Sequence, residues 1–267
     1  MMKRRILLLA ALCGLVAPPL ILSSSAAEAR VYKIGVTPGV HEQVMEFVKP
    51  LLASKGIDIE IISFSDYVLP NQAVNDGDLD MNAFQHKPYF DNQVRDRGYK
   101  LVSAGTNFIA PMGIYSKKIK SLGELKKGDS VGIPNDPTNG GRALLLLQKH
   151  GLIKLGKGVG LAATVADIVE NPKGIKIVEL DAAQMPRALE DLAAGAVNTN
   201  YAVQAGFTPK TDSIVLEDAD SPYVNIFAVK AKDKDAPWVK TIVSTYQSAP
   251  VREFILTNFK GSLVPAF

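Results

Sequence analysis

The chain has 267 residues, of which 47% are apolar and 21% charged, so it is globular rather than disordered and long enough for one large domain or two smaller ones. Its formal net charge of +3 falls to +1 without residues 1–29, because that segment holds three basic residues and one acidic residue. A chain so close to neutral indicates no nucleic-acid partner.

The N-terminal segment has the pattern of a secretory signal peptide. Basic residues at 3–5 precede an apolar run at 6–22, and a small-x-small sequence follows at 27–29. We expect cleavage after Ala29 and export to the periplasm. A retained membrane anchor is the alternative, but two prolines interrupt the apolar run.

The single cysteine, Cys13, lies inside this segment. The mature chain would then have no disulfide, no thiol nucleophile and no thiolate metal ligand. Lipid modification of Cys13 would call for a small residue just before it, and Leu12 stands there. We therefore expect an exported protein that diffuses freely rather than one attached to the membrane.

Short runs typical of strands alternate with helical patterns along the mature chain. A helix is predicted over 41–55, ending at Gly56, and Pro88 suits the first turn of a helix that runs to Gly98. Strands are predicted at 31–37, 57–64, 79–84, 101–105, 112–116 and 130–134.

A second series of elements follows. A helix is predicted over 136–151, with Asp136 as its cap and Pro137 in its first turn. The later elements are strands at 174–180, 196–201 and 223–230 and helices at 185–195, 237–247 and 250–259.

Strands separated by helices of this length predict an α/β architecture with largely parallel sheets. The strands are too many for one tidy sheet, so we predict two α/β lobes joined by extended segments near 108–115 and 219–227. The predicted division is 30–110 plus 227–267 for the first lobe and 111–226 for the second.

The motifs of common enzyme classes are missing from the sequence. It has no G-x-S-x-G elbow, P-loop or H-E-x-x-H zinc signature, and a G-x-G-x-x-A at 158–163 opens no clear helix. His41, His86 and His150 lie far apart without ligand-like spacing. We therefore predict no catalytic residue, no metal site and no cofactor.

Aromatic side chains gather in "DMNAFQHKPYF", residues 80–90. Phe84, His86 and Tyr89 fall at a strand-to-helix junction, and Tyr67 lies in a turn that ends the preceding strand. In α/β folds such positions face the crevice where ligands bind. They predict an aromatic pocket, although ordinary core rings with a structural histidine remain the alternative.

Polar candidates cluster in "NDPTNGGR", residues 135–142. Backbone N–H groups at a helix start attract anions, and a cation in the first turn, where we expect Arg142, is disfavoured by the helix dipole. A carboxylate ligand would explain it, and a surface arginine is the alternative. Asn198, Asn200 and Asn225 fall at predicted strand ends, where their amides could hold an ammonium or a carboxylate, or simply form turns.

Several stretches together closely resemble the methionine-binding proteins of the NlpA/MetQ type, which are substrate-binding components of ATP-driven methionine importers. The resemblance covers essentially the whole mature chain from about Tyr32. The stretches that carry it are "FSDYVLPN", "NAFQHKPY", "RGYKLVSAG", "YSKKIKSLGELKKG", "VGIPNDPTNGGRALLLLQKHGLIKL", "DIVENPKGIKIVEL" and "SPYVNI".

The resemblance implies a periplasmic binding protein fold, in which two α/β lobes close on the ligand and two crossover segments act as the hinge. It implies that Tyr67, Phe84, His86 and Tyr89 surround the thioether. The head group would meet Asn139, Arg142, Asn198 and Asn225, with Asn200 as a weaker match. Its partners would be methionine and the importer's membrane subunits with their ATPase, and we expect a monomer.

The family is usually attached to lipid through a cysteine after the signal, whereas an A-x-A site stands here. Three other functions stay open. The ligand could be a methionine-containing dipeptide or another apolar amino acid, the protein could be an exported hydrolase or lyase with His86 as its base, or it could be a surface adhesin or chaperone.

Overall fold

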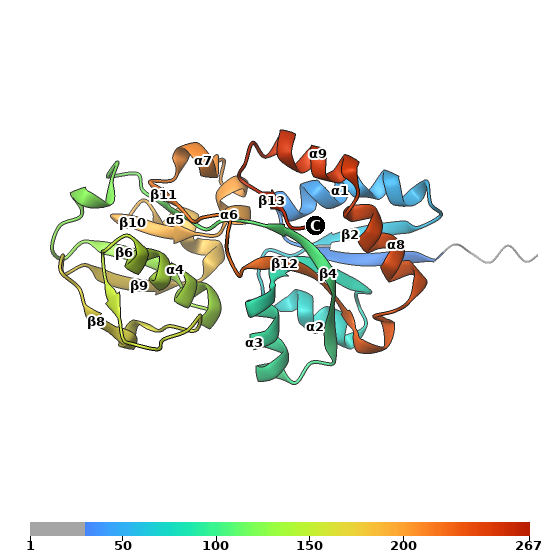
Figure 1. The fold of residues 1–267 in the computed structure, drawn as a ribbon, viewed down its shortest axis with the longest axis horizontal. Coiled ribbons are helices and arrows are strands. Elements are labelled where there is room, and N and C mark those ends of the chain that lie inside the picture. Colours follow the sequence, from blue (N-terminus) through green and yellow to red (C-terminus); the bar gives the residue numbers. More distant parts are fainter. Residues whose placement is uncertain (1–29) are drawn as a thin grey trace, which may run out of the picture.

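The computed structural model describes residues 30–267, which form two α/β lobes, each built around its own sheet (Figure 1). The predicted signal segment 1–29, with Cys13 and the cleavage site after Ala29, lies outside the described residues. Within residues 30–267, no helix has the length and apolar character needed to cross a membrane.

The first lobe has a six-stranded sheet in the order β13-β4-β12-β3-β1-β2. Strands β1, β2 and β3 run parallel, whereas β12 is antiparallel to both β3 and β4, and β13 is antiparallel to β4. The strands are β1 (Val31–Val36), β2 (Asp58–Ser63), β3 (Met81–His86), β4 (Leu101–Ile109), β12 (Val224–Lys230) and β13 (Val264–Pro265).

Helices cover both faces of this sheet, with α1, α8 and α9 on one side and α2 and α3 on the other (Figure 1). Helix α1 buries Val44, Val48 and Leu52, whose spacing of four residues gives one apolar stripe. Every residue of β3 is buried between the two layers. The helices are α1 (Val40–Ala53), α2 (Leu69–Asp76), α3 (Lys87–Arg97), α8 (Pro237–Tyr246) and α9 (Ala249–Asn258), with the short turn η4 (Ala231–Asp233).

The second lobe has a five-stranded sheet in the order β11-β5-β10-β6-β9. Its strands are β5 (Gly113–Tyr115), β6 (Ser130–Pro134), β9 (Lys176–Leu180), β10 (Ala194–Val197) and β11 (Val215–Leu216), beside a small ribbon of β7 (Lys154–Leu155) and β8 (Ile168–Glu170). Its helices are α4 (Pro137–Lys149), α5 (Met185–Ala188), α6 (Thr199–Gln204) and α7 (Pro209–Asp212), with 3-10 turns η1 (Leu122–Glu124), η2 (Val165–Asp167) and η3 (Ala182–Gln184).

The prediction of two α/β lobes is confirmed, but the prediction of largely parallel sheets is wrong. Both sheets are mixed, because β5 and β12, the strands that follow the crossovers, pair antiparallel with their neighbours. Tyr67 lies in a bend between β2 and α2, as predicted, and Asp66 Oδ1 accepts hydrogen bonds from the N–H groups of Val68 and Leu69, where α2 begins. The strand predicted at 196–201 ends at Val197, and α6 follows it.

The chain crosses between the lobes twice, at 110–112 and at 217–223. The predicted residue division remains a prediction, although β12 joins the first sheet from Val224. The lobes are in contact: Tyr201 donates a hydrogen bond to the carbonyl oxygen of Ser65 at 3.1 Å. Gly39, in the left-handed region with φ +85°, lies so close to Asn200 that a Cβ there would be 2.6 Å from the Asn200 carbonyl oxygen.

Candidate ligand-binding site between the lobes

A small cavity of about 20 Å³ lies between the lobes. All nine residues predicted for the site line it: Tyr67, Phe84, His86, Tyr89, Asn139, Arg142, Asn198, Asn200 and Asn225. The lining residues that were not predicted are His41, Gln85, Ala110 and Thr199.

Strand ends bring these side chains together. His86 ends β3 and faces Asn225 of β12 across the antiparallel ladder. In the second lobe Asn198 follows β10, and α4 begins just after β6. The carboxyl ends of the parallel strands in both sheets therefore meet at the cavity, as expected for ligand sites in α/β folds.

One end of the cavity is aromatic. The ring of Tyr67 lies with its centroid 5.9 Å from that of Phe84, 6.0 Å from Tyr89 and 5.0 Å from Tyr201. Tyr89 donates a hydrogen bond to the backbone carbonyl oxygen of Tyr67 at 2.8 Å, which links the Tyr89 side chain to the backbone at Tyr67. Tyr201 was not predicted for the site, and it contacts the ring of Tyr67 without lining the cavity.

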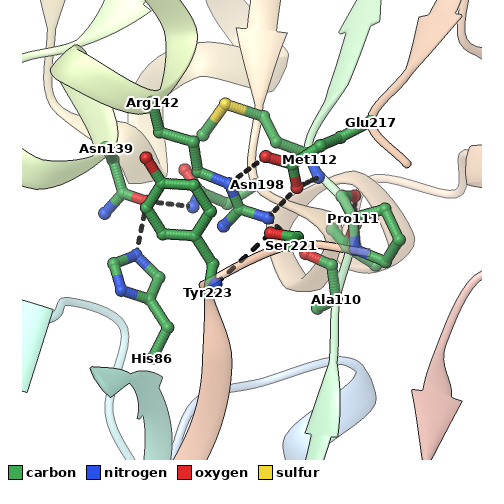
Figure 2. A network of polar contacts seen from close by, with 11 residues as sticks. His86, Ala110, Pro111, Met112, Asn139, Arg142, Asn198, Glu217, Ser221 and Tyr223 are labelled. Atoms are coloured by element: carbon green, nitrogen blue, oxygen red, sulfur yellow. Dashed lines mark hydrogen bonds and ion pairs between the residues drawn. The ribbon is translucent and has the colours of Figure 1, made fainter. Parts of the chain in front are cut away.

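His86 lines the cavity with a neutral imidazole ring. Its Nδ1 accepts the backbone N–H of Tyr89 at 3.1 Å, so its Nε2–H donates to Asn139 Oδ1 at 3.1 Å (Figure 2). Burial, helped by the charge of Arg142, lowers the pKa of His86 to about 3. Both ring nitrogens are occupied, so this histidine is poorly placed to act as a base.

His41 joins two of the asparagines. Thr37 donates its hydroxyl to His41 Nδ1 at 2.8 Å, and His41 Nε2–H donates to Asn225 Oδ1 at 3.3 Å. Asn200 Nδ2 donates to Thr37 Oγ1 at 3.4 Å, and Asn200 Oδ1 accepts from Tyr67 at 2.6 Å. Burial lowers the pKa of His41 to about 4. This histidine lies far from the other lining residues in sequence, so no local pattern indicated its place.

The asparagines at the polar end present opposite groups to the cavity. Asn139 is held by Asp136, which accepts from its Nδ2 at 2.8 Å, and Asn139 Oδ1 accepts from Asn198 Nδ2 at 2.8 Å. Asn198 Oδ1 is buried and has no hydrogen-bond partner among the described residues. Because Asn225 Oδ1 is taken by His41, Asn225 offers its Nδ2 as a donor. These two asparagines therefore offer a ligand the acceptor Asn198 Oδ1 and the donor Asn225 Nδ2.

Arg142 is not where it was expected. It lies in the second turn of α4 rather than the first, and it is buried, so the surface arginine is ruled out. Its Nε donates to Glu217 Oε1 at 3.0 Å, and its Nη2 donates to Glu217 Oε2 and, at 2.9 Å, to the carbonyl oxygen of Ala110 (Figure 2). The guanidinium also lies 4.3 Å from the centroid of the Tyr223 ring.

This arrangement limits what Arg142 can do. Both N–H groups of Nη2 and the N–H of Nε are engaged, so a ligand carboxylate would meet the guanidinium at Nη1 alone. A two-pronged pair with the ligand is therefore excluded. Sequence reasoning missed Glu217, which looks like a solvated acidic residue in "VLEDAD", and Tyr223, although "SPYVN" contains it.

Among residues 30–267 no group of three or more His, Cys, Asp or Glu side chains is arranged to hold a metal ion. His41 and His86, distant in sequence, line the same cavity, but both are committed to hydrogen bonds with side-chain or backbone neighbours. The cavity thus combines an aromatic end with a polar end that holds one buried cation, one free acceptor and one free donor.

Comparison with known proteins gives consistent results. The NlpA lipoprotein family model matches residues 32–267. The chain is 56% identical over 235 residues, 87% of each chain, to the D-methionine-binding lipoprotein MetQ of Salmonella typhimurium. It resembles the structure of a nutrient-binding protein from Burkholderia cenocepacia bound to methionine, with a TM-score of 0.86, 53% identity, and 88% of this chain and 100% of that one covered.

A periplasmic substrate-binding protein of an ABC transporter from Coxiella burnetii is also similar, with a TM-score of 0.85 and 46% identity, over 88% of this chain and 100% of that one. The two-lobe fold of a periplasmic substrate-binding protein, expected from sequence, is thereby confirmed.

Proposed function

Since this chain belongs to the NlpA lipoprotein family, we propose that it is an exported solute-binding protein that captures methionine between its lobes and delivers it to an ATP-driven importer. The observation that supports this most strongly is the composition of the cavity. An aromatic end opposite a polar end with separate acceptor and donor groups matches a zwitterionic amino acid with an apolar side chain.

The polar end would bind the head group. The ligand's ammonium donates to Asn198 Oδ1, which has no other partner in the described part of the chain. The carboxylate accepts from Arg142 Nη1 and Asn225 Nδ2. Hydrogen bonds to charged groups contribute about 1.5–3 kcal/mol each, because they replace weaker contacts with water.

The aromatic end would bind the side chain. Tyr67, Phe84 and Tyr89 line the end of the cavity where the thioether would lie, and His86 forms part of the same wall. Burying a methionine side chain contributes about 1.5–3 kcal/mol, and contacts between sulfur and rings add about 0.3–1.5 kcal/mol.

Capture between the lobes follows from these magnitudes. Immobilising a ligand costs an estimated 4–15 kcal/mol, and in the upper half of that range neither set of contacts covers the cost alone. The rings come mainly from the first lobe, whereas Asn139, Arg142 and Asn198 come from the second. Tight binding therefore accompanies contact between the lobes, and that joined shape is what the importer's membrane subunits and their ATPase would respond to. We propose that the protein acts as a monomer.

A binding role fits the histidines better than catalysis does. A hydrolase or lyase would use His86 as its base, but both of its nitrogens are hydrogen-bonded and its pKa is lowered to about 3. We therefore propose that the protein is not an enzyme. The adhesin or chaperone alternative has no support from any feature of the cavity.

The test is identification of the ligand. Native mass spectrometry of the purified protein should reveal bound methionine, and calorimetry on protein unfolded, stripped and refolded should show tight binding of L-methionine, D-methionine or both. A methionine dipeptide and leucine serve as comparison ligands. Tighter binding of either comparison ligand, or no binding of methionine, would contradict the proposal.

Processing of the N-terminus needs a separate test. The name of the Salmonella relative includes the word lipoprotein, which favours attachment to a membrane over the freely diffusing form expected from the A-x-A site. The two routes leave different mature chains, one beginning at Arg30 and one at a lipid-modified Cys13. The intact mass of the protein from a membrane fraction and from a soluble fraction distinguishes them.

A further inference from the structure

Glu217 holds Arg142 from the side away from the cavity. Its carboxylate accepts from both Nε and Nη2 of Arg142, and also from the backbone N–H of Met112 at 3.3 Å (Figure 2). The backbone N–H of Glu217 donates to the Met112 carbonyl oxygen at 2.9 Å. The carboxylate is therefore fixed between the two crossover segments rather than free to turn into solvent.

The position of Glu217 affects the net charge around the cavity. Of the residues that line the cavity, Arg142 alone carries a formal charge at neutral pH, because His41 and His86 are neutral. Glu217 does not line the cavity, yet its side chain is only 14% exposed and it adds one negative charge directly behind the guanidinium. The pair together contributes no net charge.

We propose that Glu217 is a specificity-determining residue, which cancels the charge of Arg142 so that the site accepts net-neutral zwitterions and rejects anionic analogues of the same shape. This inference rests on the proposed function, because it assumes that the carboxylate of an amino acid binds at Arg142. No direct contact between Glu217 and the ligand is needed.

The physical reason is the cost of uncompensated charge in a buried site. A zwitterion brings its own ammonium, which donates to Asn198 Oδ1, and so adds no net charge to the site. An analogue with a hydroxyl in place of the ammonium brings a net negative charge close to Glu217. Repulsion between the ligand carboxylate and Glu217 on the other side of the guanidinium, screened as in a protein near its surface, weakens binding by about tenfold. With Arg142 alone, the site would no longer disfavour the anion on the ground of charge.

The experiment compares two probes, L-methionine and 2-hydroxy-4-(methylsulfanyl)butanoate, by calorimetry in wild type and in Glu217→Gln. Glutamine removes the charge and keeps one oxygen acceptor, which can still accept from Arg142 Nη2 and the Met112 N–H, while the acceptor for Arg142 Nε is lost. We expect wild type to bind methionine at least about tenfold more tightly than the hydroxy analogue, and the variant to shift this ratio toward the analogue by about tenfold.

Asp218→Asn is the matched control. It removes the same charge from the adjacent residue, whose exposed carboxylate pairs with exposed Lys149 and does not contact Arg142. Its ratio should equal that of wild type. A shift in Asp218→Asn as large as that in Glu217→Gln would overturn the proposal, since it would reflect only the total charge of the molecule.

The remaining outcomes are distinct. Wild type that binds both probes equally overturns the proposal without any variant, which covers the case in which Glu217→Gln does not fold. Wild type that prefers methionine while a folded Glu217→Gln keeps the same ratio overturns the inference alone. Wild type that binds neither probe contradicts the proposed function as well.

Discussion

The two ends of the cavity hold their side chains by different means. At the aromatic end, Tyr67, Phe84 and Tyr89 touch one another through ring contacts at centroid distances of 5.9–6.2 Å. At the polar end, Asn139 and Arg142 are each fixed by two or more hydrogen bonds of defined direction. Ring contacts tolerate small shifts, whereas hydrogen bonds weaken steeply when they are bent. Changes at the polar end should therefore cost more affinity than changes at the aromatic end.

The largest effect is expected from Arg142→Ala. It removes the one cation at the polar end, so methionine affinity measured by calorimetry should fall about 100-fold or more. It also leaves Glu217 partly buried without its partner, and urea denaturation should show a loss of about 3–5 kcal/mol in the free energy of unfolding.

A double variant, Arg142→Ala with Glu217→Ala, separates the two roles of Arg142. Stability should be largely recovered, because no unpaired carboxylate remains, while affinity should stay low. If the double variant binds methionine as wild type does, the head group is bound elsewhere.

A smaller effect is expected from Asn225→Ala. It removes the Nδ2 donor and leaves His41 Nε2–H without its acceptor, so affinity should fall about tenfold. Asn75→Ala, on the same lobe but outside the cavity lining, is the control and should bind as wild type does. Equal affinities for the two variants would remove Asn225 from the site.

At the aromatic end, Tyr67→Phe should have a weaker effect. The ring stays and only the hydrogen bond from the hydroxyl to Asn200 Oδ1 is lost, so affinity should fall about two- to fivefold. Tyr67→Ala removes the ring itself and should fall further. A loss for Tyr67→Phe as great as that for Asn225→Ala would contradict the difference drawn between the two ends.

The smallest effect on binding is expected from pH. His41 and His86, with pKa values lowered to about 4 and about 3, stay neutral between pH 5 and 8, so methionine affinity should be constant over that range. A change of tenfold or more over these pH values would show that a charged imidazole takes part in binding.

Stability should respond to pH where binding does not. Below pH 6.5 these two histidines are protonated in the unfolded chain but not in the folded protein, so the unfolded state binds more protons. The free energy of unfolding therefore falls as the pH drops from 6.5 toward 4, by about 1.4 kcal/mol per pH unit for each histidine. Urea denaturation of wild type and His86→Gln should show a shallower fall in the variant.

Local signals predicted the elements well. The helix over 136–151 was expected from Asp136 and Pro137, and Asp136 indeed caps α4 by accepting the N–H of Asn139 at 2.9 Å. The strand at 130–134 was predicted to the residue. These features depend on neighbours within a few positions, which the sequence displays directly.

Long-range features were harder to predict. The pairing of Arg142 with Glu217 spans 75 residues, and nothing near either residue indicates the other. Strand direction was misjudged for the same reason, because β12 enters the first sheet only after the whole second lobe is complete. The nine predicted site residues converge on one cavity because family resemblance supplied the long-range information that periodicity lacks.

Gly39 limits how closely the two lobes can approach each other. Its backbone meets that of Asn200 with no room for a single methyl group, since a Cβ would lie 2.6 Å from a carbonyl oxygen. The methyl group of an alanine at this position would clash with the Asn200 carbonyl oxygen and keep the two lobes apart. Each lobe would keep its own ligand-binding residues, but the ligand could not contact both lobes at once. The absence of a side chain at Gly39 thus sets how closely the two lobes can approach each other at this contact.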